Sequence, residues 1–276
     1  MNPFLGASKD RKNSRILISG IPFDGTSSFR AGSRFAPASI REASQSIETY
    51  SVYQDRCLDD FKFFDAGDID ISPGDTKRAV KKVFRFARKN SDKILVSLGG
   101  EHLVTLGLVQ ALHERYKDMI LVCLDAHTDL RDNYLGIKLS HATVLRRIVD
   151  MGLKVVLLGA RSGTKEEFEF ARKNNILHSF DDFKKMDYII KGKKIYVSID
   201  MDVFDPGFVP GVSNPEAGGI NFIDFMKWLK EFPFQSVIGV DVVEINPGCD
   251  PSFISSVFAA KLLREILIRL SYQIKT

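Results

Sequence analysis

The sequence predicts an α/β fold built on a mostly parallel central sheet. Five short apolar runs recur along the chain, and segments with amphipathic helical spacing follow most of them. Each run is apolar at nearly every position, which is typical of strands that a parallel sheet buries on both faces. Strands are therefore expected at residues 94–98, 120–124, 155–158, 195–199 and 237–240.

The N-terminal part of the chain carries the same alternation. A strand at residues 15–25 is expected to lead into a long basic loop that reaches Pro37, and this loop is expected to line a pocket or to contact another subunit. The pattern then predicts a helix at 38–50 capped by Ser39, a half-buried edge strand at 61–70 and a helix at 75–89.

The remaining expected helices lie at 104–116, 142–151, 165–173 and 255–270. The last has the apolar repeat of a helix that packs against the sheet. No linker, internal repeat or low-complexity segment interrupts the alternation. Residues 1–276 are therefore expected to form a single domain, a length at which one α/β domain buries a large core.

Charge and cysteine usage exclude several classes of protein. The net charge of +4 is small, and basic residues alternate with acidic ones, so no nucleic-acid partner is expected. Cys57, Cys123 and Cys249 lack CxxC spacing and are expected to be free thiols in a reducing compartment. Neither a signal peptide nor an apolar run of about 18 residues is present, so we expect a cytoplasmic protein without membrane contact.

Metal-type ligands follow several of the expected strands. The strand at 94–98 is followed by GGEH, which ends at His102, and the strand at 120–124 is followed by Asp125, His127 and Asp129. The remaining groups after strands are Asp200, Asp202, Asp205, Asp241 and Glu244. Functional groups gather at the carboxyl ends of parallel strands, so we expect these side chains to meet.

The donor types favour a pair of hard or borderline divalent ions such as Mn²⁺. Two histidines and four aspartates are too many for one tetrahedral zinc, and they lack the thiolates of a structural zinc site. Local roles are the alternatives: His102 could cap the following helix, and Asp202 or Asp205 could serve the turn at Pro206 and Gly207.

The motifs also resemble those of the ureohydrolase family, which includes arginases and agmatinases. The similarity covers nearly the whole chain, and the opening segments are similar to the agmatinase branch. The motifs are GIPFDGTSSFRAGSRFAP at 20–37, IREAS at 40–44, GGEH at 99–102, DAHTD at 125–129, SIDMDVFDP at 198–206 and DVVEINP at 241–247.

The resemblance implies a three-layer αβα fold and a centre of two Mn²⁺ ions that hydrolyses a guanidinium group to urea and an amine. It implies that one ion is held by His102, Asp125, Asp129 and Asp200, and the other by Asp125, His127, Asp200 and Asp202. Many members have GGDH where this chain has Glu101, a change beside a ligand that could alter the surroundings of the metal.

Two further residues match catalytic positions of the family. Glu244 matches a glutamate that binds the guanidinium group, and His141 lies where the family has a histidine that moves protons. The chemistry is consistent with both roles, because a carboxylate binds a guanidinium through charge-assisted hydrogen bonds and a histidine exchanges protons near pH 7. No role is expected for His113 or His178.

The resemblance favours agmatine, or an N-substituted agmatine such as N1-aminopropylagmatine, as the small guanidino substrate. The loop between Asp129 and His141 lacks the run of Ser, Thr and Asn with which arginases hold an α-carboxylate. Asp132 would also repel a carboxylate, whereas Asp132 or Glu216 would favour a distal amine. A homo-oligomer, a trimer or hexamer, is implied. The alternatives are activity on arginine or a guanidino acid, or a non-catalytic metal-binding role.

Overall fold

The structure is a computed structural model that describes residues 2–72, 74–180 and 187–274. Its centre is an eight-stranded sheet in the order β4-β1-β5-β10-β9-β6-β7-β8, and every neighbouring pair is parallel. The strands are β1 (Ile16–Gly20), β4 (Phe63–Asp68), β5 (Ile94–Leu98), β6 (Ile120–Leu124), β7 (Lys154–Leu158), β8 (Leu177–His178), β9 (Ile195–Asp200) and β10 (Val237–Val243).

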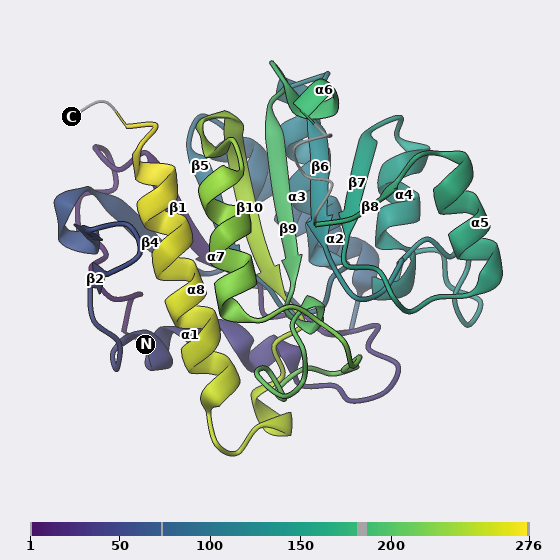
Figure 1. The fold of residues 1–276 in the computed structure, drawn as a ribbon, viewed down its shortest axis with the longest axis horizontal. Coiled ribbons are helices and arrows are strands. Elements are labelled where there is room, and N and C mark those ends of the chain that lie inside the picture. The colour runs from purple at the N-terminus through teal and green to yellow at the C-terminus, as the bar shows by residue number, and fades with distance from the viewer. Residues whose placement is uncertain (1, 73, 181–186, 275–276) are drawn as a thin grey trace.

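Helices cover both faces of this sheet (Figure 1), which confirms the expected three-layer αβα arrangement. Side chains of one set of helices share a buried cluster with one sheet face, and the other set shares a second cluster with the opposite face. The first set is α1 (Ala36–Ser44), α6 (Asp187–Ile190), α7 (Phe222–Glu231) and α8 (Ile254–Ser271), and the second is α2 (Thr76–Lys89), α3 (Val104–Arg115), α4 (Val144–Asp150) and α5 (Lys165–Lys173).

Strand β6 shows why the strands are apolar throughout. Ile120, Val122 and Leu124 belong to the first buried cluster, whereas Leu121 and Cys123 belong to the second. Successive side chains of a strand point to opposite faces, so a strand covered by helices on both sides needs apolar residues at every position. In the edge strand β4 only Phe63 is buried, and the residues after it are partly buried or exposed, as expected for a half-buried edge strand.

The first helix differs from the expectation at both ends. It begins at Ala36 with Pro37 in its first turn, and Ser39 does not cap it, because the Ser39 hydroxyl contacts the Ser256 hydroxyl at 2.7 Å. It ends at Ser44, since the Ser44 hydroxyl donates to the carbonyl of Arg41, an alternative to continued helix. The chain then forms a two-stranded ribbon of β2 (Tyr50–Ser51) and β3 (Arg56–Cys57).

Helices α6 and α7 and strand β8 also have no counterpart among the expected elements. Helix α7 is capped by Asn221, whose side chain accepts hydrogen bonds from the backbone N–H groups of Ile223 and Asp224, a start signal that the sequence does contain. Strand β8 has only two residues, too few for a detectable pattern. Strand β10 continues to Val243, beyond the expected end at residue 240, so Asp241 lies within the strand.

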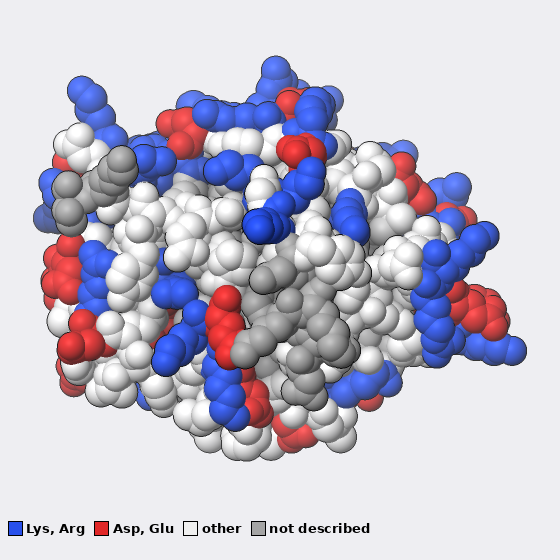
Figure 2. Space-filling view, turned by 45° about the horizontal axis from the view of Figure 1, so that its top comes forward, with Lys and Arg blue, Asp and Glu red and all other residues white. Residues whose placement is uncertain are grey.

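All eight strands point the same way, so their carboxyl ends share one edge of the sheet. In Figure 1 the arrowheads of β9 and β10 point to the lower edge. Figure 2 brings the opposite edge forward and shows Lys and Arg interspersed with Asp and Glu around it.

None of the described helices has the length and apolar character needed to cross a bilayer. The three cysteines are free, as expected.

Candidate metal centre and catalytic cavity

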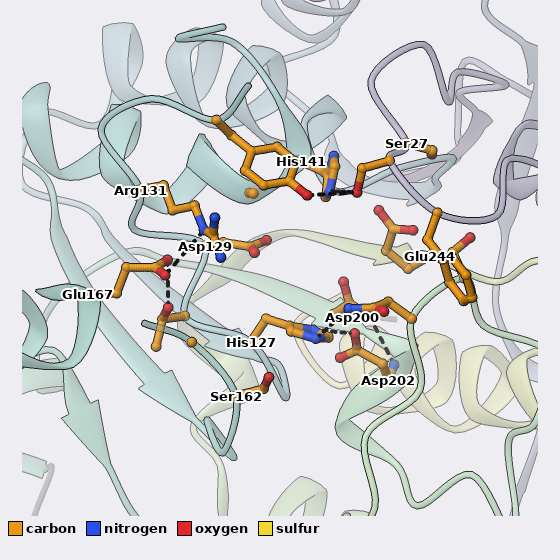
Figure 3. Close-up of a pocket in the computed structure, with 18 of the residues that line it drawn as sticks. Ser27, His127, Asp129, Arg131, His141, Ser162, Glu167, Asp200, Asp202 and Glu244 are labelled. Atoms are coloured by element: carbon orange, nitrogen blue, oxygen red, sulfur yellow. Dashed lines mark hydrogen bonds and ion pairs between the residues drawn. The ribbon is translucent and has the colours of Figure 1, made fainter. Parts of the chain in front are cut away.

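A cavity of about 260 Å³ opens at the carboxyl ends of the central strands. Its walls include His127, Asp129, His141, Asp200, Asp202 and Glu244, which Figure 3 shows turned toward one another. His102 and Asp125 lie buried just beneath, and His102 is within ion-pair distance of both Asp125 and Asp129. The structure therefore brings together all eight residues that the sequence singled out as ligands or catalytic groups.

The first group of potential ligands surrounds the imidazole of His102. Its Nδ1 lies 3.0 Å from Asp129 Oδ2, 3.1 Å from Asp125 Oδ2 and 3.5 Å from Asp200 Oδ2. One N–H cannot serve three carboxylates, and Asp125 Oδ2 has no hydrogen-bond partner among the described residues. A cation that several carboxylate oxygens share would satisfy this arrangement.

The opposite nitrogen of His102 is held by a hydrogen-bonded chain. Its Nε2 lies 3.1 Å from the hydroxyl of Ser198, and that hydroxyl donates to Asp241 Oδ1 over 2.5 Å. Tyr196 and Thr105 also donate to Asp241. Asp241 is thus a buried support behind the site rather than a group at a strand exit, which corrects the sequence-based placement. Such contacts orient a histidine whose other nitrogen binds metal.

The second group of potential ligands surrounds His127. Its Nδ1 is 2.7 Å from Asp202 Oδ2 and 3.8 Å from Asp125 Oδ1. Oxygen and nitrogen atoms of Asp125, His127 and Asp202 lie within 4.8 Å of one another, close enough to bind a shared ion. Asp125 belongs to both groups. Asp200 lies between them, because one of its carboxylate oxygens is 3.5 Å from His102 Nδ1 and the other accepts the backbone N–H of Asp202.

The electrostatics of the site also favour the binding of cations. Burial, together with repulsion from Asp202 and Asp129, raises the pKa of Asp125 to about 7. Burial and acidic neighbours raise the pKa of Asp200 as well, and burial with repulsion from Glu101 raises the pKa of Glu244 to about 8. Divalent cations would relieve this repulsion and keep the carboxylates ionised. The donor set therefore fits a two-metal centre.

Glu244 is turned into the cavity by the chain beyond β10. Its backbone is left-handed, with φ of 66°, and its N–H donates to the carbonyl of Gly100. The Glu244 carboxylate accepts the backbone N–H of His102 at 2.8 Å. Gly100 cannot carry a side chain, since a Cβ there would lie 1.9 Å from the carbonyl oxygen of Phe23. A Cβ at Gly99 would lie 2.5 Å from Val243 Cγ1, so the two glycines let the GGEH motif pack closely against the loop after β1 and the end of β10.

His141 lies at the opposite side of the cavity from the ligand cluster (Figure 3). It begins the turn before α4, as expected, and its ring packs edge-on against Tyr134 with 5.6 Å between ring centroids. Burial lowers the pKa of His141. Near neutral pH this histidine is therefore largely a neutral acceptor that can take up a proton and release it.

The basic loop after β1 does line the cavity, through Ser27, Ser28 and Phe29. Its arginines have partners in the same chain. Arg30 donates to the carbonyls of Val212 and Ser213, which ties the segment around Asn214 to the site, and Arg34 pairs with Asp24.

Several lining residues escaped the sequence analysis. Arg131 and Glu167 form an ion pair of 3.4 Å, and Asn214 lies 2.9 Å from His127 Nε2. Glu167 was detectable, since Thr164 and Glu167 form a capping box at the start of α5. Arg131, Tyr134 and Asn214 lie in loops whose sequences carry no comparable signal.

Two other acidic residues have structural partners. Asp132 is not among the lining residues, and its carboxylate accepts from Arg147 at 2.6 Å, so the expectation that it lines the cavity is wrong. Asp205 accepts the backbone N–H groups of Gly207 and Gly218, which confirms its turn role. Glu216 approaches His127 Nε2 to 3.7 Å.

Known proteins resemble this chain over nearly its full length. A model for the arginase family matches residues 14–268. The chain is 39% identical to an agmatinase of Bacillus cereus, covering 96% of this chain and 95% of that protein. It is 38% identical to the N(1)-aminopropylagmatine ureohydrolase of Thermococcus kodakarensis, with 91% and 89% covered. The solved agmatine ureohydrolase of Thermoplasma volcanium superimposes with a TM-score of 0.89 at 33% identity, covering 100% of this chain and 97% of that one.

Proposed function

Because this chain belongs to the arginase family, we propose that it hydrolyses the guanidinium group of agmatine or an N-substituted agmatine to urea and an amine. The observation that carries the proposal is the cavity in which Glu244 and His141 face a buried cluster of carboxylates. A cationic substrate needs such an anionic wall, and hydrolysis needs a group that exchanges protons.

We propose that two Mn²⁺ ions occupy the cluster. His102, Asp125, Asp129 and Asp200 would hold one ion, and Asp125, His127, Asp200 and Asp202 the other, with Asp125 and Asp200 shared. The oxygen-rich donor set and the contacts of His102 Nδ1 with three carboxylates support this assignment. A bound metal pair lowers the pKa of water, which supplies hydroxide at neutral pH.

Two side chains of the cavity would bind the substrate and transfer a proton. Glu244 is fixed by the backbone N–H of His102, so its free oxygen is oriented to accept from the guanidinium N–H groups. His141 is exposed to the same cavity and would pass a proton to the departing amine. Burial of the carboxylates keeps water away from the ionic contacts and strengthens them.

We expect agmatine to be the preferred substrate because the arginine in the cavity wall already has an acidic partner. The lining residues from the loop between Asp129 and His141 are Arg131 and Tyr134, and the charge of Arg131 is offset by Glu167. A substrate carboxylate would thus lose water without gaining an unpaired cation, which costs on the order of a few kcal/mol. Asp132 contributes nothing to this preference, because Arg147 binds it.

A guanidino acid is the second candidate, and Arg131 is the observation that favours it. The guanidinium of Arg131 lines the cavity, and its side chain is 39% exposed. If it released Glu167, it could bind a carboxylate through two parallel hydrogen bonds. Such a substrate would carry a carboxylate at the end opposite its guanidinium group, as 4-guanidinobutyrate does.

The deciding experiment measures urea release from agmatine, N1-aminopropylagmatine, 4-guanidinobutyrate and arginine under Mn²⁺ loading. We expect kcat/KM for agmatine or its aminopropyl derivative to exceed that for arginine by on the order of 100-fold, the equivalent of the desolvation cost. A preference for arginine contradicts the proposal. Arg131→Gln separates the two candidates, because it lowers kcat/KM only for a substrate whose carboxylate Arg131 binds.

Three broader features complete the proposal. Residues 1–276 are proposed to form one catalytic domain, which is supported by a single sheet whose strands run from Ile16 to Val243. A cytoplasmic location is supported by the free state of the three cysteines. A homo-oligomer, a trimer or hexamer, is supported by the family resemblance, and its size is measured by light scattering.

A further inference from the structure

The hydroxyl of Thr26 lies behind the catalytic cavity, between Glu101 and His141. Thr26 Oγ1 is 2.6 Å from Glu101 Oε1, 3.0 Å from the backbone nitrogen of His141 and 3.3 Å from His141 Nδ1. The backbone N–H of Thr26 donates to the second oxygen of Glu101 at 2.7 Å. These contacts join the loop after β1, the GGEH motif after β5 and the turn before α4.

Each partner of this hydroxyl has a definite hydrogen-bonding role. A hydroxyl donates one hydrogen bond and accepts two, an ionised carboxylate only accepts, and a backbone N–H only donates. The Thr26 proton therefore goes to Glu101, and one Thr26 lone pair accepts the N–H of His141. The remaining lone pair faces Nδ1 of His141, so that nitrogen must carry a proton to complete the contact.

The other ring nitrogen faces the cavity. His141 Nε2 lies 3.4 Å from the hydroxyl of Ser28, and Ser28 and Tyr134 line the cavity with His141, whereas Thr26 and Glu101 do not. Tyr134 donates to Ser28 and packs against the imidazole, which limits rotation of the ring. An imidazole protonated on Nδ1 thus presents an unprotonated Nε2 to the substrate.

We propose that Thr26 and Glu101 are positioning residues that fix His141 in the Nδ1–H tautomer, so that Nε2 is the atom that accepts and delivers the catalytic proton. This inference rests on the proposed role of His141 in guanidinium hydrolysis. It also gives a reason for Glu101 at this position, because both of its oxygens contact Thr26 and an aspartate would be shorter by one methylene.

The test reads the tautomer directly. Protein labelled with ¹⁵N-histidine and supplemented with diamagnetic Zn²⁺ is studied by long-range ¹H–¹⁵N correlation at pH 8.5. The His141 signals are identified by their loss in His141→Asn. We expect the Nδ1–H pattern in the wild type, a shift toward Nε2–H in Thr26→Val, and the wild-type pattern in Thr26→Ser, which keeps the hydroxyl.

Turnover gives a second readout. Thr26→Val should lower kcat by on the order of 10- to 100-fold, less than the full contribution of a general acid, with KM within about twofold. Thr26→Ser should restore kcat to within about threefold, which loss of folding or of a methyl contact would not produce. Equal melting temperatures of the two variants establish that both are folded.

Two results would overturn the inference: an Nε2–H pattern for His141 in the wild type, or an unchanged Nδ1–H pattern in Thr26→Val. The spectrum reports the tautomer whether or not the protein releases urea. Absence of urea release from every guanidino compound, with the expected tautomer shift present, therefore contradicts the proposed function and leaves the hydrogen-bond assignment standing.

Discussion

Replacing Asp125 by asparagine should raise the stability of the metal-free protein and reduce the stabilisation that metal binding provides. The substitution removes one charge from the buried cluster but keeps the local backbone contact, because an amide oxygen can still accept the N–H of His127 that Asp125 Oδ1 accepts at 2.6 Å. Asp125 Oδ2 has no hydrogen-bond partner among the described residues. In the asparagine variant an NH₂ group replaces it and can donate to a neighbouring carboxylate.

The size of the effect follows from the pKa of Asp125, which burial and repulsion from Asp202 raise from 3.8 to about 7. The folded, metal-free protein binds this proton more tightly than the unfolded chain does. Its stability therefore falls as pH rises from 3.8 to about 7 and is level above. At about 1.4 kcal/mol per pKa unit, ionised Asp125 destabilises the metal-free protein by up to roughly 4 kcal/mol at pH 8.

Thermal unfolding measured by circular dichroism tests this reasoning. In EDTA at pH 8, Asp125→Asn should melt up to roughly 10 °C above the wild type, and the difference should shrink as pH falls toward 4. With Mn²⁺ at about 100 times its Kd the wild type should gain about 2.7 kcal/mol, and the variant little. Asp224→Asn, which removes an exposed carboxylate paired with Lys227, is the control and should behave as wild type.

A variant that melts below the wild type in EDTA, or that gains as much from Mn²⁺ as the wild type, would refute the assignment of Asp125. The first result would mean that its carboxylate stabilises the fold without a cation. The second would mean that the ions bind elsewhere.

Three other substitutions test the support of His102, the substrate contact and the proton transfer. Ser198→Ala breaks the link between His102 and Asp241 and should weaken Mn²⁺ binding by on the order of 10- to 100-fold, measured by metal titration; unchanged affinity would show that the link is only structural. Glu244→Gln should raise KM and lower kcat together, whereas His141→Ala should lower kcat with KM largely kept; wild-type kinetics in Glu244→Gln would reject the guanidinium contact.

The sequence was sufficient to predict that the candidate ligands lie close together, because one topological rule links distant segments. Asp125 directly follows β6, Asp200 ends β9, and His102 ends the GGEH motif that follows β5. Parallel strands bring their carboxyl ends to a single edge. Their proximity therefore needs no knowledge of side-chain packing. The same rule explains the one error among the strand exits: Asp241 belongs inside β10, and a strand boundary is uncertain by a few residues from pattern alone.

The outer parts of the site could not be predicted, since no periodic pattern specifies contacts between loops. Thr26 and His141 are 115 residues apart, and neither lies in a strand. Asp132 illustrates the same limit, because its position in sequence suggests the cavity while a salt bridge to Arg147 on α4 holds it elsewhere. Side-chain direction in a loop depends on such tertiary contacts rather than on local sequence.

An unusual backbone conformation directs two of the carboxylates into the cavity. Asp129 and Glu244 both have left-handed backbone, with φ of 49° and 66°, a conformation of non-glycine residues that costs on the order of 1–3 kcal/mol. Hydrogen bonds to rigid elements hold it: the Asp129 carbonyl accepts the N–H groups of Leu145 and Arg146 in α4, and the Glu244 N–H donates to Gly100 after β5. The two carboxylates thus enter the cavity because neighbouring elements stabilise an unfavourable backbone conformation. A substitution that loosens α4 should therefore displace Asp129, although α4 itself contributes no proposed metal ligand.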